Sequence, residues 1–177
     1  MITLRKASAS DIPALHALVE SGYRGESAKR GWTHEADLLG GQRTDPQALA
    51  DIIADPAQTI LLAEDNGALA GCVLIADEGD RNGKPIAYLG MLTVSPERQS
   101  AGLGRQLIAA AETHARKLGA ASMEMTVIKQ RRELIAWYLR RGYVDTGREE
   151  PFPLDDERFG LPKSRDLVFI VLAKTLQ

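Results

Sequence analysis

One strand–loop–helix stretch in the middle of the chain limits the possible folds more than any other feature. Residues 86–94 are typical of a strand, and residues 103–118 place apolar side chains at helical spacing. A polar loop with two glycines, Gly102 and Gly104, joins them. A helix that begins in this way leaves its first backbone N–H groups unpaired at the positive end of its dipole. The stretch therefore predicts a turn that binds phosphate.

Two common phosphate motifs do not fit this turn. The dinucleotide fingerprint needs a third glycine, but that position is Leu107. A P-loop needs Gly-Lys-Ser/Thr, but Arg105 follows Gly104. The pattern that remains is Gln99-x-x-Gly102-x-Gly104 after a strand. A tight turn without a ligand is the alternative interpretation, and it does not explain two glycines together with a polar loop.

The rest of the chain predicts a mixed fold of the α+β or α/β class. Asn66-Gly67 is a strong hairpin signal, and Asp45-Pro46 is typical of a helix start. The order β-α-α-β-β-β-α-β-α-β-β favours a mostly antiparallel N-terminal sheet with one strand–helix–strand crossover. We expect strands at 2–7, 59–63, 69–75, 86–94, 122–128, 143–146 and 167–172, and helices at about 11–22, 46–55, 103–118 and 131–141. The connections are a polar turn at 77–84, a glycine-rich loop at 21–41 with a turn at 35–39, and a long loop at 148–166.

Composition narrows the class of protein further. The 177 residues predict one domain, 1–177, and a net charge of −2 gives no general attraction to nucleic acid or anionic membranes. A membrane span needs about 20 apolar residues, and no stretch approaches that length. The single Cys72 excludes an intramolecular disulfide, and nothing in the spacing of His16 and His34 suggests a metal. The N-terminus has no signal-peptide core, so we expect a cytoplasmic protein.

Residues 92–105 resemble motif A of the GCN5-related N-acetyltransferase (GNAT) superfamily, which has the form [Q/R]-x-x-G-x-[G/A]. A second segment, residues 134–143, resembles motif B of the same superfamily. Its tyrosine, glycine and aromatic positions match at Tyr138, Gly142 and Tyr143. The family commonly has Asn where this chain has Arg131, and Ala where it has Leu134. The predicted element order also follows the family over nearly the whole chain.

This resemblance implies a mixed, mostly antiparallel sheet with splayed strands four and five, flanked by about four helices. It implies acetyl-CoA as cosubstrate, with no metal. The pantetheine arm would pair with the main chain of Leu92 and Val94, and Gly90 fits the bulge that the splay requires. The backbone around the glycines would hold the pyrophosphate. The implied coenzyme-binding residues are Leu92, Thr93, Val94, Gln99, Ser100, Ala101, Gly102, Leu103, Gly104 and Arg105.

The resemblance also implies direct transfer of acetyl to a primary amine in a ternary complex. Tyr138 would protonate the departing thiolate as general acid, although a tyrosine on a helix can also be a core residue. The expected strand 86–94 carries no acidic residue, so the general base is open. The candidates are Glu26, Glu35 and Glu124, with a water relay as the alternative. Cys72 lies in another strand and is not expected to act as a nucleophile.

Two loops are candidates for the acceptor site. By resemblance, the loop at 21–41 walls that site, with Tyr23, Glu26, Trp32 and Glu35 as contacts. The loop at 148–166, rich in Pro and Phe, is either a second wall or a homodimer contact. We therefore expect an N-acetyltransferase for a small or amino-acid-like amine. A peptide or protein N-acetyltransferase and a non-catalytic acyl-CoA sensor are the alternatives, and an acyl group other than acetyl stays open.

Overall fold

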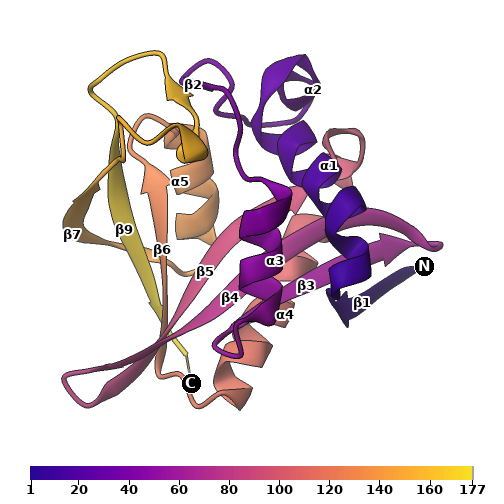
Figure 1. The fold of residues 1–177 in the computed structure, drawn as a ribbon. Coiled ribbons are helices and arrows are strands. Elements are labelled where there is room, and N and C mark those ends of the chain that lie inside the picture. The colour runs from indigo at the N-terminus through magenta and orange to yellow at the C-terminus, as the bar shows by residue number, and fades with distance from the viewer. Residues whose placement is uncertain (177) are drawn as a thin grey trace.

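A seven-stranded sheet runs through the computed structural model, which describes residues 1–176 apart from the side chain of Ser100 (Figure 1). Its strand order is β1-β3-β4-β5-β6-β9-β7, and every pair is antiparallel except β5–β6. The strands are β1 Ile2–Lys6, β3 Gln58–Asp65, β4 Ala68–Arg81, β5 Lys84–Val94, β6 Ser122–Ile128, β7 Val144–Pro151 and β9 Val168–Thr175. Two further short strands, β2 Leu39–Gly40 and β8 Leu161–Pro162, pair with each other.

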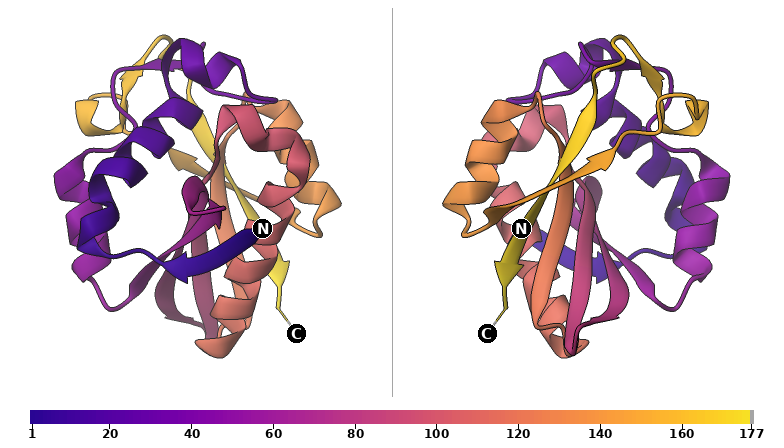
Figure 2. Two further views of the ribbon diagram at one scale, coloured as in Figure 1. Left: turned by 90° about the vertical axis from the view of Figure 1, so that its right-hand side faces the viewer. Right: turned by 90° about the vertical axis from the view of Figure 1, so that its left-hand side faces the viewer.

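Helices cover both faces of this sheet (Figure 2). They are α1 Ile12–Tyr23, α2 Gly25–Lys29, α3 Pro46–Ala54, α4 Leu103–Lys117 and α5 Arg132–Arg140, with 3₁₀ turns at Ala9–Asp11, Pro96–Ala101 and Glu157–Phe159. One core lies under α1 and α3, and a larger one lies under α4 and α5. Strand alternation sends Cys72 of β4 into the first core, and Val73 and Ile75 into the second. None of the helices within residues 1–176 has the length and apolar character needed to cross a membrane.

The centre of the sheet is open. Strands β5 and β6 pair only from Ile86↔Ser122 to Tyr88↔Glu124 and then diverge, which Figure 1 shows as a V. Just beyond the last pair, the β4 register passes from Leu74↔Gly90 to Cys72↔Thr93, so one residue of β4 faces two of β5. This bulge bends β5 away from β6. The mixed, splayed sheet predicted from the motifs is confirmed, although the bulge lies one position beyond the predicted Gly90.

A methionine occupies the strained position of this bulge. Met91 has φ +51°, a left-handed conformation that non-glycine residues rarely adopt. Its side chain is 5% exposed and packs in the core under α1, next to Cys72. Packing of the Met91 side chain in the core therefore holds its backbone in a left-handed conformation, which the intrinsic preference of methionine disfavours.

Three predicted connections differ from the structure. The expected polar turn at 77–84 is a continuation of β4 and β5, closed by Asn82-Gly83 with positive φ at both residues. Its residues project beyond the sheet, so both faces meet water and no apolar alternation marks the strands. The loop at 21–41 forms α2 and β2, and only a turn occurs at 36–38. The loop at 148–166 holds the end of β7 and all of β8.

Candidate active site

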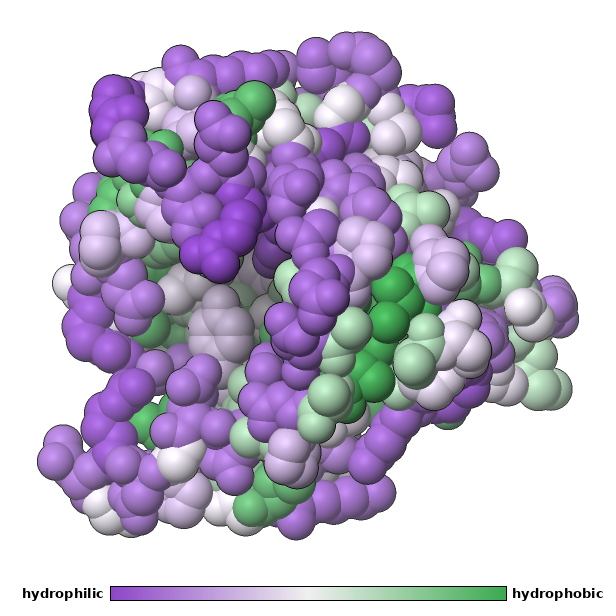
Figure 3. Space-filling model, viewed as in Figure 1, coloured by the Kyte–Doolittle hydropathy of each residue, from purple (hydrophilic) through white to green (hydrophobic). Residues whose placement is uncertain are grey.

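Two cavities lie side by side at the opening of the sheet. We name the first the glycine-loop cleft, a cavity of about 280 Å³ lined by Gly22, Tyr23, Trp32, Thr33, Leu92, Thr93, Val94, Gln99, Gly102, Gly104, Arg105, Arg131, Leu134, Trp137, Tyr138 and Arg141. We name the second the inner cavity, of about 330 Å³, lined by Tyr23, Arg24, Glu35, Leu39, Arg43, Tyr88, Leu89, Gly90, Met91, Leu92, Met125, Thr126, Val127, Ile128, Arg131, Leu134, Tyr138, Phe152, Pro153, Phe159 and Phe169. Figure 3 shows a hollow on this face, rimmed mostly by hydrophilic residues.

The start of α4 forms the floor of the glycine-loop cleft. Gly102 has φ +77° and turns the chain into the helix. The N–H of Gln106 donates to the carbonyl of Gly102 at 3.3 Å, which is the first hydrogen bond of the helix. The N–H groups of residues 103–105 precede it and have no acceptor within the helix. A Cβ on Gly104 would lie 3.5 Å from the Trp137 ring, so the missing side chain keeps this floor open.

The charge of the glycine-loop cleft is one-sided. Arg105, Arg131 and Arg141 line it, and its described lining contains no carboxylate. The guanidinium of Arg141 lies 4.9 Å from the centre of the Trp137 ring, which holds it in place, and no carboxylate of residues 1–176 pairs with it. Free N–H groups, a helix dipole, Arg105 and Arg141 together fit a ligand with several phosphate charges, while Arg131 is paired with Glu35 at the boundary with the inner cavity.

Gln99 connects the cleft to the loop above it. Its Oε1 accepts a hydrogen bond from the N–H of Trp32 at 2.5 Å, and its Nε2 donates to the carbonyl of Val94 at 3.2 Å. A Cβ on Gly31 would lie only 2.6 Å from that Oε1, so the loop approaches closely because this residue is glycine. The half-exposed Trp32 is thereby held at the mouth of the cleft.

The other predicted coenzyme contacts fall into two groups. Leu92, Val94, Gly102, Gly104 and Arg105 line the cleft, and Thr93 does so although its buried hydroxyl donates to the carbonyl of Met91. Leu103 and Ala101 are not among the lining residues of the cleft. The side chain of Leu103 is buried in the core, Ala101 is exposed, and the side chain of Ser100 lies outside the described part of the chain.

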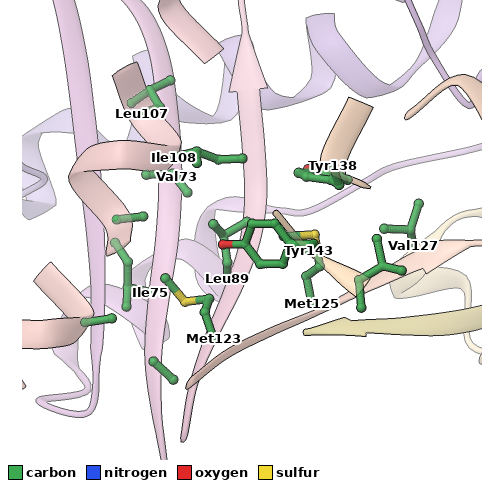
Figure 4. Close-up of a cluster of buried hydrophobic side chains, with 14 of the residues drawn as sticks. Val73, Ile75, Leu89, Leu107, Ile108, Met123, Met125, Val127, Tyr138 and Tyr143 are labelled. Atoms are coloured by element: carbon green, nitrogen blue, oxygen red, sulfur yellow. The ribbon is translucent and has the colours of Figure 1, made fainter. Parts of the chain in front are cut away.

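The two cavities share five lining residues, which we name the junction: Tyr23, Leu92, Arg131, Leu134 and Tyr138. The hydroxyl of Tyr23 donates to the carbonyl of Leu92 at 2.9 Å, which fixes the bulged strand against α1. Tyr138 is 5% exposed, and its ring meets Trp137 edge to face. It meets Tyr143, which lies beside it in Figure 4, in the same way. Its hydroxyl has no hydrogen-bond partner among the described residues. Burial raises the pKa of Tyr138, so the junction holds a protonated, available phenol.

The inner cavity contains a buried ion-pair group. Glu35 is 6% exposed, and its Oε1 accepts from Nη1 of Arg24 at 2.5 Å while its Oε2 accepts from Nη1 of Arg131 at 3.2 Å. Arg24 also donates through Nη2 to the carbonyl of Phe159 at 3.1 Å. This group ties three distant segments together around the cavity.

The structure separates the three candidate bases. Glu35 lines the inner cavity, but both of its oxygens are engaged by arginine. Glu26 is exposed, pairs with Lys29 and lines neither cavity. Glu124 pairs with Arg81 and Arg148 and also lines neither cavity. The predicted residues Tyr23, Trp32, Glu35 and Tyr138 are therefore brought to the cavities, and Glu26 and Glu124 are not.

Several lining residues were not identified from the sequence. Arg24 and Arg43 supply charge to the inner cavity, and the hydroxyls of Tyr88 and Thr126 lie 2.8 Å apart on its wall. Tyr88 lies in β5 and Thr126 in β6. Strand alternation does not reveal that β5 and β6 separate, so no local sequence signal predicts that these two residues line a cavity. Phe152 and Phe159, from the loop that was predicted as an acceptor wall or a dimer contact, line the inner cavity.

Comparison with known proteins identifies the family. The profile of the Acetyltransferase (GNAT) family matches residues 26–143, which is more than half of the chain. The chain belongs to this family. The match includes the whole glycine-rich turn and the Tyr138 helix, so the resemblance predicted from the two GNAT motifs is confirmed.

Individual relatives agree with the GNAT assignment. The chain is 29% identical over 121 residues to mycothiol acetyltransferase of Propionibacterium freudenreichii subsp. shermanii, a match that spans 63% of this chain and 38% of that protein. Ribosomal-protein-S18-alanine N-acetyltransferase of Escherichia coli superposes with a TM-score of 0.71 at 18% identity, covering 100% of this chain and 95% of that one. Salmonella typhimurium yncA, whose structure holds its cofactor acetyl-CoA, gives 0.71 at 19% identity, covering 100% and 95%. At such identities, the two structures show that the fold is shared.

Proposed function

We propose that this protein is an acetyl-CoA-dependent N-acetyltransferase, which transfers acetyl to a primary amine of a small, amino-acid-like molecule by direct attack in a ternary complex. The observation that carries the proposal is the junction, where a phosphate-binding cleft and a second cavity meet at Leu92 and Tyr138. A thioester anchored from one side and an amine bound from the other would meet there.

The glycine-loop cleft fits coenzyme A by its chemistry. The N–H groups of residues 103–105, together with Arg105 and Arg141, suit the pyrophosphate. Beyond Tyr88 this edge of β5 has no partner strand among residues 1–176, so an amide-bearing arm could add here as an extra strand. The carbonyls of Leu92 and Val94 each already accept one side-chain hydrogen bond, and each keeps a second lone pair for the arm. Acetyl-CoA supplies an activated acyl group as a thioester. The chain supplies main-chain dipoles at the bulge that can polarise the thioester carbonyl.

Tyr138 is the proposed general acid. Its hydroxyl has no competing partner among the described residues, and burial raises its pKa, so it is protonated at neutral pH. Burial also makes a thiolate that leaves at the junction more basic, so the sulfur would take the phenol proton to give the free thiol. The phenolate that remains on Tyr138 would regain a proton from solvent before the next turnover.

For the proton of the attacking amine we propose a water relay. Glu35 is the single carboxylate among the described lining residues of the inner cavity, and two arginines already occupy it. The positive charge of Arg24, Arg43 and Arg131 disfavours a bound ammonium ion and so favours the neutral amine that attacks. Glu35 acts in this account as a positioning residue that holds Arg24 and Arg131.

The enclosure of the inner cavity favours a small acceptor over a protein. Its lining includes Phe152, Pro153 and Phe159 from the 148–166 loop, and Leu39 and Arg43 from the 35–43 loop. A long peptide would need an open groove here. The peptide or protein N-acetyltransferase therefore ranks second.

The proposed function is tested with the purified chain, acetyl-CoA and a panel of amines. Acetyl-CoA at 100 times its Kd should stabilise the fold by about 2.7 kcal/mol, measured as a shift in Tm. Thiol release should depend on the amine, mass spectrometry should find the acetylated amine, and double-reciprocal plots should intersect as direct attack requires. Binding without turnover of any amine would favour a non-catalytic acyl-CoA sensor, and absence of binding would contradict the coenzyme assignment.

A further inference from the structure

The inner cavity carries more positive than negative charge. Arg24, Arg43 and Arg131 line it, and Glu35 is the one carboxylate among the lining residues that the structure describes. Arg24 and Arg131 share that carboxylate, one on each oxygen. The main-chain N–H of Arg43 donates to Oε1 of Glu20 at 2.9 Å, but its guanidinium forms no ion pair with a carboxylate of residues 1–176. A cavity of this kind lowers its electrostatic energy when an anion enters it.

Two of these arginines also keep unused donors. The side chains of Arg24 and Arg131 are 6% and 8% exposed, and the Nε of each is buried without an acceptor in the described part of the chain. A buried N–H without a partner costs free energy, so such a group marks a place where an acceptor atom of a ligand would be stabilising.

Arg43 is held in a way that leaves its charge free. Its guanidinium carbon lies 4.9 Å from the centre of the Tyr23 ring, and Tyr23 belongs to the junction. Stacking on a ring fixes the plane of a guanidinium but does not use its N–H donors. The arrangement leaves Arg43 able to form the paired hydrogen bonds that guanidinium makes with carboxylate.

The rest of the wall is apolar. Leu39, Phe152, Phe159 and Phe169 line the inner cavity, and the tilted rings of Phe152 and Phe169 lie 5.2 Å apart. An acceptor that fills this cavity therefore presents an apolar body to the phenylalanines and an anionic group to the arginines.

We infer that the acceptor is an anionic amine with an apolar side chain, of which an apolar α-amino acid is the simplest form, and that Arg43 and Arg131 bind its acidic group. The inference rests on the proposed function, because it places the acceptor in the inner cavity of an acetyltransferase. It excludes cationic polyamines as preferred acceptors, since a second positive charge would lie against the arginines.

The test compares matched acceptors. L-leucine, L-methionine and L-phenylalanine are each paired with their carboxamides, and phosphoethanolamine and spermidine complete the panel. We expect kcat/KM for the acids to exceed that for the amides by about 10- to 100-fold, the contribution of a charge-assisted hydrogen bond. Arg43→Gln should remove that preference, and Arg43→Lys should retain part of it. Arg165→Gln, which removes the same charge from an exposed site, should leave it unchanged.

A second readout separates this inference from the proposed function. With coenzyme A bound, the N-acetylated acids should raise Tm in the wild type and not in Arg43→Gln. Preference for amides or spermidine, or acids that neither react nor shift Tm, would overturn the inference even if another amine is acetylated. Preference for phosphoethanolamine over every amino acid would also overturn the inference, because that anionic amine has no apolar side chain for the phenylalanines of the inner cavity. Failure of acetyl-CoA to bind would instead contradict the proposed function.

Discussion

The two cavities are built in different ways. The glycine-loop cleft takes most of its lining from one continuous stretch, residues 92–105, and from one helix, α5. The inner cavity shares α5 and combines it with the end of α1, the 35–43 loop, β5, β6 and residues 152–169. Glycines and backbone N–H groups at the start of α4 form the floor of the first, whereas arginine and aromatic side chains line the second. The difference suggests a general rule. A site for a coenzyme that a whole family binds can be built from neighbouring residues in the sequence, whereas a site that selects one acceptor is assembled from distant segments.

The largest expected effect is a loss of affinity for coenzyme A through a change in the glycine-loop cleft alone. Gly104→Glu places a carboxylate on the floor of the glycine-loop cleft, where the pyrophosphate is proposed to lie. Like charges at such an interface cost several kcal/mol, so Kd for coenzyme A should rise about 100-fold or more. Isothermal titration measures the affinity, and Tm without ligand checks the fold.

Gln106→Glu is the matched control for this prediction. It adds the same charge two residues further along α4, on the exposed side of the helix. Gly102 is less suitable, because its φ of +77° makes any side chain there strained. Equal loss of affinity in Gln106→Glu would mean that overall charge, and not the floor of the cleft, controls binding.

The next largest effect concerns the buried ion pairs of the inner cavity. Glu35→Ala leaves Arg24 and Arg131 without their carboxylate, which should reduce the free energy of unfolding by about 3–5 kcal/mol. The exposed Glu26→Ala should change it by about 0.5 kcal/mol or less. Urea denaturation measures both.

The same pair of positions tests the general base. If Glu35 or Glu26 took the proton of the amine, kcat of its Gln variant would fall by about 10²–10⁴. The assay temperature should be well below the Tm of each variant, so that a loss of stability does not lower kcat. We expect Glu26→Gln to keep wild-type turnover and Glu35→Gln to act mainly on stability and acceptor KM. A loss of that size in kcat alone for Glu35→Gln, with the acceptor KM unchanged, would restore it as the base.

A smaller effect follows from the buried phenols. Burial raises the pKa of Tyr138 and of Tyr143. Unfolded tyrosines release their protons near a pH of about 10, whereas the folded state keeps these two protons at that pH. The free energy of unfolding should therefore fall as the pH rises above about 10. Tyr143→Phe should reduce this slope. An alkaline limb of kcat below about pH 9 that disappears in Tyr138→Phe would contradict the raised pKa.

The smallest effect is an expected lack of reaction. Cys72 is fully buried, and burial raises its pKa to about 12, so little thiolate forms at pH 8. Iodoacetamide should leave the native chain unmodified and active, and should label its single cysteine after denaturation. Rapid loss of activity by native-state labelling at Cys72 would contradict direct transfer without a protein nucleophile.

Much of the fold was predictable because its signals are local. Asp45 caps α3 by accepting from the N–H of Ala48 at 2.8 Å, and Asn66-Gly67 closes the hairpin with positive φ at both residues. The 77–84 hairpin was missed because polar strands that project into water lack the alternation that marks strands in a core.

The same contrast applies to the candidate site. The glycine-loop cleft and Tyr138 follow motifs in the sequence, since their geometry depends on adjacent residues. Arg43 and Tyr88 reach the inner cavity only because β5 and β6 separate and the 35–43 loop folds over the opening. Arg131 carried one signal, because it stands where GNAT proteins commonly have Asn. Its pairing with Glu35, 96 residues away, could not be predicted from spacing.

The most direct test of the account is the single variant Tyr138→Phe. The ring keeps its packing against Trp137 and Tyr143, and only the hydroxyl at the junction is lost. If this hydroxyl protonates the departing thiolate, kcat should fall by about 10²–10⁴. Kd for acetyl-CoA should stay within about threefold of the wild type, because the coenzyme is anchored elsewhere. An unchanged kcat in an assay limited by chemistry would contradict the claim that the junction is where acetyl transfer occurs through Tyr138.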